Sequence, residues 1–471
     1  METQQVGTPY EAKVSRTVWS RGKVGEFLLE FQRLTYCYFI PYLLFLNLSD
    51  GANWASILPF TLFYTFRMTG LFLIRSIRLG LDSYTLLMIA LLMGGAGSLL
   101  GIFGVLYFPL FYLSSILLGF SAAWLLPANV TVNYHEKRQG FTNMTGKKYI
   151  FALLLLVLLF RSIELSGTTQ IVVTLGLYTL FYIMAYHTIS HYPRYELDFK
   201  EMKTTIFVTK EFVLFIVFFV LLFLLRNARL LVEPELFDLT IYVFLFLFVL
   251  AAFYLGRGKK NWQFPSWLNL MNFLSGMVGN FLFLFSTFYV GVLYGFDHLA
   301  TYMYLPYIAG MVVAKLIGNR ILRSFPSPPV IVQLIGLSLS LLILLIPTAF
   351  VIGLFFLSFC HAVISGWLNR VCYDTDTDIP MDQRVIIKFT TQNKGSVVHQ
   401  FLLMGLLLVL TRWLELPVAV LLQLTDKLRI PTISMQLMEY AKWGNISWLL
   451  LGVLGVYLLW KREVRHHANN D

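Results

Sequence analysis

The chain has 471 residues and a formal net charge of +11 at pH 7, and its composition is 58% hydrophobic, 16% aromatic and only 13% charged. Soluble domains carry roughly 25% charged residues, so this composition excludes an ordinary soluble protein. The positive charge requires no nucleic-acid partner, because basic residues beside membrane spans face anionic lipid head groups.

Apolar segments follow one another along the whole chain. The hydrocarbon core of a bilayer, about 30 Å thick, is crossed by about 20 apolar residues in a helix. Segments of this kind predict an all-α polytopic membrane protein with fourteen transmembrane helices. The predicted spans are 27–48, 54–74, 83–101, 106–128, 149–165, 168–190, 207–225, 236–255, 267–294, 298–318, 330–347, 348–369, 395–411 and 445–460.

The basic residues predict the orientation of these spans. Most of the 36 Lys and Arg residues fall in alternate gaps between spans. Basic residues in short loops resist translocation, so both termini are expected in the cytoplasm, with the protein in the inner or plasma membrane. Residues 1–25 lack the apolar core of a signal peptide. The three cysteines form no CxxC pair, so we expect no disulfide, no zinc site and no cofactor.

The chain repeats itself at an offset of 240 residues, where 63–78 matches 303–318. This duplication predicts a six-helix bundle over 1–190, two inserted helices with their linkers over 191–260, and a second six-helix bundle over 261–471 that includes an outer loop at 412–444. Two like halves around a cavity are a common transporter architecture. The matched pairs are Tyr64 with Tyr304, Gly70 with Gly310, Arg75 with Lys315, and Asn129 with Asn369.

In these features the chain resembles the major facilitator superfamily, specifically its fourteen-helix branch typified by proton-coupled drug exporters. The family's motif after helix 2 reads roughly G-x-L-A-D-R-x-G-R, and Gly70, Arg75 and Arg78 occupy its glycine and two basic positions. Gly310 and Lys315 occupy the equivalent glycine and first basic positions in the matching segment 303–318. The motif's acid and second glycine are not kept, and the antiporter motif of helix 5 is absent. The resemblance implies that these five residues belong to gating loops.

Charges inside spans are costly and are functional candidates by default. Arg67 lies in the second span, and Glu30 lies at a similar shallow cytoplasmic depth in the first. A Glu30–Arg67 pair is a candidate inner gate or protonatable switch. A fixed ion pair or a snorkelling arginine is the alternative.

The ninth span carries amides on one face, including Asn272 and Asn280. Such a face suits either a substrate cavity or helix packing with interhelical hydrogen bonds, and the resemblance favours substrate contact. His361 and His399 lie on helices whose counterparts in that family line or flank the cavity. Imidazole titrates near physiological pH, so these histidines are candidates for proton coupling, with hydrogen-bonded packing as the alternative.

The aspartates Asp374, Asp376 and Asp378 resemble the start of a calcium loop. Ile379 stands where an EF-hand needs glycine, and the distal glutamate is missing. We therefore expect these carboxylates to pair with basic loops or to be solvated, and the sequence leaves cation binding open.

The sequence predicts a secondary active transporter that exports a small amphipathic molecule by alternating access, with proton coupling left open. No Asp or Glu lies near the centre of a span, which favours a neutral, zwitterionic, anionic or lipid-like substrate. The alternatives are a lipid or lipid-linked glycan flippase, and a membrane-embedded transferase that would use Asp374 with His135 and Glu136. No catalytic residue or nucleic-acid partner is expected, and a periplasmic adaptor is left open.

Overall fold

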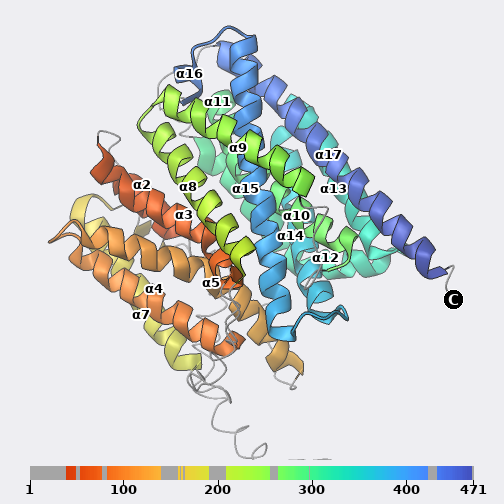
Figure 1. The fold of residues 1–471 in the computed structure, drawn as a ribbon, viewed down its shortest axis with the longest axis horizontal. Coiled ribbons are helices and arrows are strands. Elements are labelled where there is room, and N and C mark those ends of the chain that lie inside the picture. Colours follow the sequence, from red (N-terminus) through yellow and green to blue (C-terminus); the bar gives the residue numbers. More distant parts are fainter. Residues whose placement is uncertain are drawn as a thin grey trace, which may run out of the picture. The chain divides into compact units, whose positions relative to one another are not determined.

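The computed structural model describes most of the chain as helices (Figure 1). No strand occurs among the described residues, and nine of their helices are long and apolar enough to cross a membrane. The protein is therefore an all-helical, multi-pass membrane protein. The described residues are 39–48, 53–76, 82–138, 158–159, 161–162, 165–189, 208–254, 264–295, 298–422 and 432–468.

The predicted spans coincide with helices wherever the chain is described. Residues 27–38 of the first predicted span and most of the fifth, 149–165, lie outside the described residues. Each of the other predicted spans overlaps a helix or a continuous run of helices. The count of fourteen and the orientation stay predictions.

Contacts divide the chain into two compact units, Met1–Phe212 and Val213–Asp471. In the first unit, α5 packs against both α3 and α4, and α4 also packs against α7. Small residues permit this closeness: a Cβ atom on Gly94 of α4 would lie 2.3 Å from the ring of Tyr182 in α7. The helices of this unit are α2 (Phe39–Leu48), α3 (Trp54–Ser76), α4 (Ser83–Phe103), α5 (Leu110–Arg138) and α7 (Gly167–Ile189).

The second unit begins within α8 (Thr209–Leu230) and continues through α9 (Pro234–Tyr254). A π-helical turn, η2 (Phe281–Phe285), interrupts the next span between α10 (Ser266–Asn280) and α11 (Ser286–Tyr294). A second π turn, η4 (Ala300–Tyr304), precedes α12. The remaining elements are α12 (Leu305–Ser324), α13 (Pro329–Leu345), the short η5 (Pro347–Ala349), α14 (Phe350–Asp374), α15 (Met381–Trp413), α16 (Val418–Leu422) and α17 (Thr432–Ala468).

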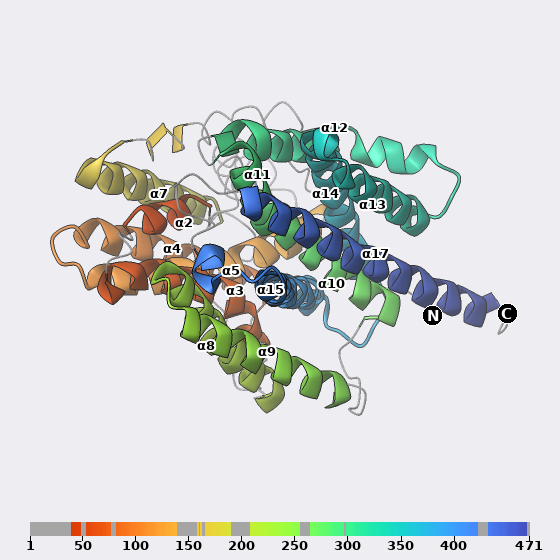
Figure 2. The ribbon, with the colours of Figure 1, turned by 90° about the horizontal axis from the view of Figure 1, so that it is seen from above.

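Two glycines bring α10 and α15 into direct backbone contact. A Cβ atom on Gly276 of α10 would lie 1.8 Å from the carbonyl oxygen of Gln392 in α15, and a Cβ on Gly395 would lie 2.0 Å from that of Phe273. No larger residue fits at either position without moving a helix. Figures 1 and 2 show α10 beside α15, with α14 next to them, and these three helices contact one another.

Helix contacts repeat between the two units when their helices are compared in chain order. The pairs α3–α5, α4–α5 and α4–α7 in the first unit correspond to α12–α14, α13–α14 and α13–α17 in the second, and all six pairs are in contact. The matched glycines also have matched roles, because Gly70 packs on α5 and Gly310 packs on α14. An offset of 240 would place the counterpart of α7 at 407–429 and not at α17, so the duplication stays a prediction.

The boundaries differ from the predicted domains in two respects. Most of α8 and all of α9 group with the second unit, where α9 packs on α15 through the stacked rings of Phe244 and Phe401, 4.1 Å apart. The predicted outer loop 412–444 is shorter, because α17 already begins at Thr432. Polar residues interrupt the apolar pattern in the first turns of α17, so the sequence pattern predicts a later start for this span.

Candidate functional site

A chain of hydrogen bonds links α14, α10 and α15 inside the second unit. His361 Nε2 lies 3.0 Å from the Ser275 carbonyl oxygen and 3.4 Å from Ser275 Oγ. Gln392 Nε2 donates to the same hydroxyl at 3.2 Å, and Lys388 Nζ donates to Gln392 Oε1 at 2.8 Å. We call these four residues the polar chain. Because a carbonyl oxygen only accepts, His361 carries its proton on Nε2.

Lys388 is the charged end of the polar chain. Its residue is 0% exposed, and its Nζ lies 4.0 Å from the centre of the Phe389 ring. Among the residues that the structure describes, no carboxylate lies within ion-pair distance of this ammonium group. A buried lysine with a neutral amide as its hydrogen-bond acceptor is uncommon, because buried charges are normally paired.

Two more interhelical contacts surround the polar chain. Asn272 on α10 donates to the Cys372 sulfur on α14 at 3.3 Å, and Asn280 donates to His399 Nδ1 on α15 at 3.0 Å. Asn272 Oδ1 and His399 Nε2 are buried and have no hydrogen-bond partner among the described residues. Both predicted asparagines and both predicted histidines therefore take part in contacts between α10, α14 and α15.

A narrow recess lies beside the polar chain, on the side of α13. It is lined mainly by apolar side chains, with Ser275 and His361 as its polar members. The apolar lining residues are Met271, Leu274, Val278, Leu337 and Ile364. In this conformation the recess is closed and leaves no room for a ligand, so the polar chain lies against an apolar wall and not beside an open cavity.

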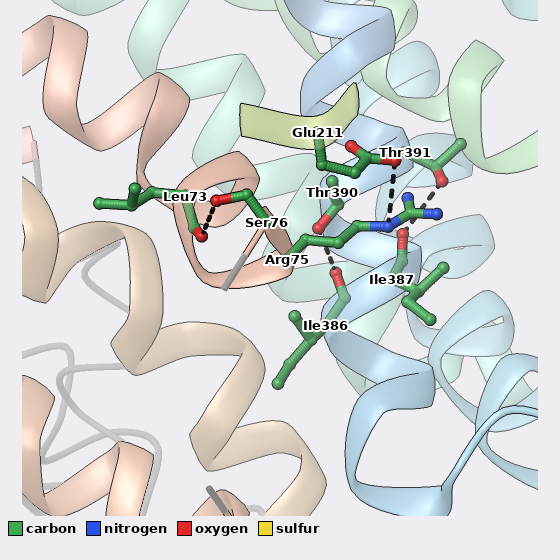
Figure 3. Close-up of polar contacts among 8 residues, drawn as sticks. All are labelled: Leu73, Arg75, Ser76, Glu211, Ile386, Ile387, Thr390 and Thr391. Atoms are coloured by element: carbon green, nitrogen blue, oxygen red, sulfur yellow. Dashed lines mark hydrogen bonds and ion pairs between the residues drawn. The ribbon is translucent and has the colours of Figure 1, made fainter. Parts of the chain in front are cut away.

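Several other predicted site residues belong to the first unit. Arg67 is half-buried on α3, whereas Glu30 and Arg78 lie outside the described residues, so their pairing and gating roles stay predictions. Arg75, near the end of α3, forms an ion pair with Glu211 in the first turn of α8, with Nε and Oε1 3.4 Å apart (Figure 3). The backbone N–H of Val208 also donates to the carbonyl of Ser76 at 2.7 Å. Together these contacts tie the end of α3 to the start of α8.

The two residues of the matching segment, Gly310 and Lys315, both lie on α12 in the second unit. Gly310 lies where α12 meets α14, and a Cβ atom there would come 2.5 Å from the Phe355 carbonyl oxygen. Lys315 is exposed on α12.

Arginine organises the aspartate-rich loop between α14 and α15. Arg384 donates to the carbonyl oxygens of Ile379 at 3.0 Å, Tyr373 at 2.9 Å and Thr377 at 3.4 Å. Asp374, Asp376 and Asp378 are exposed, and no group of metal-ligating side chains occurs among the described residues. The loop conformation is therefore explained by one guanidinium group bonded to its backbone.

Sequence reasoning missed Lys388 and Gln392. The predicted span began at 395, which left both residues in a cytoplasmic gap, whereas α15 begins at Met381. It also missed a second buried cluster, in which Lys442 Nζ lies 2.7 Å from Glu439 Oε2 and 3.0 Å from Tyr289 Oη, and Tyr289 donates to Glu439. The three-residue spacing of Glu439 and Lys442 is the signal that predicts their pairing on one helix face.

Comparisons with known proteins agree with this architecture. No protein-family model and no curated protein matches the sequence. Among solved structures, the chain is similar to the peptide transporter POT in complex with sulfate, at 9% identity over 94% of each chain with a TM-score of 0.52.

Two further similarities have TM-scores below 0.5. A bacterial homologue of the human lysosomal transporter Spinster is 12% identical over 94% of this chain and 97% of its own, with a TM-score of 0.45. The E. coli protein FucP, a major facilitator superfamily transporter, is 10% identical over 89% of this chain and 99% of its own, with a TM-score of 0.40. The likeness to POT establishes the fold alone: this chain has the fold of a solved membrane transporter.

Proposed function

We propose that this protein is a secondary transporter that exports a small amphipathic molecule by alternating access. The polar chain carries this proposal. Ionisable groups buried in membrane helices are expensive and are by default candidates for a substrate or ion pathway. Here the polar chain joins three helices beside an apolar recess. The shared fold with POT supports a transport role.

Alternating access explains why the polar chain is covered. In a transporter of this architecture, two halves rock about a central site and expose it to one side at a time. Within the polar chain, Lys388 is 0% exposed and Ser275 is 3% exposed, as expected for a conformation in which this part of the pathway is closed. We also propose that His361 or His399 couples proton movement to transport.

Transport by purified protein in proteoliposomes tests the proposal. We expect a panel of dyes and drugs to include at least one molecule whose movement depends on the protein. Gln392→Leu removes the link between Lys388 and Ser275, and the loss of one such bond, about 1.4 kcal/mol, should slow transport about tenfold.

The matched control is Ser338→Ala on α13, since this hydroxyl bonds only the carbonyl of its own helix, at Leu334. Its rate should equal that of the unaltered protein. An imposed pH gradient measures coupling, and a parallel lipid-scrambling assay identifies a flippase. Absence of transport for every molecule, or an unchanged rate in Gln392→Leu, contradicts the proposal.

A further inference from the structure

The ammonium group of Lys388 lacks a counter-ion within the described protein. An ammonium has three N–H donors, and Lys388 uses one of them, toward the neutral amide of Gln392 at 2.8 Å. The Phe389 ring, 4.0 Å from Nζ, adds a weaker cation–π contact. The other two donors have no acceptor among the described residues. A fully covered charge of this kind is costly unless an opposite charge joins it.

Unused hydrogen-bonding capacity gathers around the same junction of α10, α14 and α15. Asn272 on α10 donates a hydrogen bond to the Cys372 sulfur on α14. The other polar atom of Asn272, Oδ1, is buried without a partner. The junction therefore offers two free donors on a cation and one free acceptor on an amide. An anionic group would accept hydrogen bonds from the Lys388 ammonium, and a neighbouring hydroxyl or N–H would donate to Asn272 Oδ1.

We propose that Lys388 binds the anionic group of the transported molecule, a carboxylate, phosphate or sulfate borne on an apolar body. This inference rests on the proposed transport function and names its substrate class. The polar chain runs from the Lys388 ammonium to the recess at Ser275 and His361. The recess is closed in this conformation, so the apolar part of the substrate meets the wall formed by Met271, Leu274 and Val278 when the helices separate in the open state.

Binding of short amphipathic ions to the full-length protein in detergent tests the inference. Thermal unfolding is followed by tryptophan fluorescence at constant ionic strength, with sodium hexanoate, hexyl phosphate or hexylammonium chloride as probes. We expect the two anions to raise the unfolding temperature in a saturable manner and hexylammonium to have no such effect. Lys388→Met should weaken the apparent affinity for the anions at least about tenfold, which corresponds to about 1.4 kcal/mol.

Two further variants make the result specific to this side chain. Lys388→Arg keeps the positive charge and should retain most of the stabilisation, so it reports on the site if Lys388→Met does not fold. Lys461→Met removes an exposed lysine near the end of α17 and should behave like the unaltered protein. Equal anion affinity in the unaltered protein and in Lys388→Met overturns the inference, as does equal stabilisation by hexylammonium.

The anion can belong to a free molecule or to a lipid head group, and the lipid arm distinguishes these sources. The same variants are compared in nanodiscs of phosphatidylcholine with and without phosphatidylglycerol. Stabilisation by phosphatidylglycerol alone, lost in Lys388→Met, identifies a lipid anion, whereas stabilisation by hexanoate identifies a free one. No stabilisation in either arm overturns the inference. If Lys388→Met still transports the panel molecules at the full rate, the transport function stands and this inference fails.

Discussion

Replacing Gly276 by alanine is expected to separate α10 from α15. The added methyl group would lie 1.8 Å from the Gln392 carbonyl oxygen, whereas ordinary contact begins at 3.4 Å, so one helix must move by about 1.6 Å. Overpacking of this type costs typically about 1–3 kcal/mol. The obstacle is backbone rather than a flexible side chain, so we expect about 3 kcal/mol, reduced by about 1 kcal/mol for the better helix propensity of alanine.

The net loss of about 2 kcal/mol corresponds to a fall of about 4–8 °C in the unfolding temperature, by the scaling for large soluble domains. Thermal unfolding in detergent measures it. Gly366→Ala on α14 is the matched control, because no atom lies within 4 Å of a Cβ there, and its stability should be unchanged or slightly higher. The same displacement stretches the 3.2 Å bond from Gln392 to Ser275, so transport should also fall. Equal unfolding temperatures in the two variants would refute this account of the contact.

Two further predictions concern charged contacts in the second unit. Glu439→Gln leaves the 0% exposed Lys442 without its carboxylate, so we expect a loss of about 3 kcal/mol in thermal unfolding; an unfolding temperature equal to that of the exposed control Gln436→Ala would contradict this. Arg412→Gln removes an ion pair with Asp238 in which the arginine side chain is 53% exposed, so the loss should stay below about 1 kcal/mol and shrink with added salt; a large, salt-independent loss would show that the pair is shielded from solvent.

The positions of most helices were predictable because a bilayer imposes its thickness on the sequence. An apolar run of about 20 residues leaves few alternatives to a spanning helix. Helix ends were less predictable, since α15 begins at Met381 and α17 at Thr432, well before their apolar runs. Some polar residues in these early turns have partners elsewhere in the fold, as Glu439 has in Tyr289, and hydropathy along one chain carries no information about such partners.

The candidate site was predictable only in part, since Lys388 and Gln392 were missed. The spacing of the amides on α10 predicts a polar face, and in the structure Asn272 and Asn280 on this face contact α14 and α15. Its partners lie far away in sequence, with 86 residues between Ser275 and His361 and 119 between Asn280 and His399. Only the folded bundle reveals which amide meets which imidazole, and it alone shows that Lys388 is covered.

The π-helical turn η2 adds a residue to the span between Asn280 and Tyr289. Its signature is the N–H of Ser286, which bonds the carbonyl oxygen of Phe281, five residues earlier. Each residue in an α-helix rotates the chain by about 100° about the helix axis. The extra residue therefore changes the side of the helix from which Tyr289 projects. Deleting one phenylalanine from 281–285 would restore a regular α-helix and turn the Tyr289 side chain away from Glu439 and Lys442. The extra residue thus allows one continuous span to make two contacts on different sides: Asn280 bonds His399, and further along Tyr289 bonds Glu439 and Lys442 on α17.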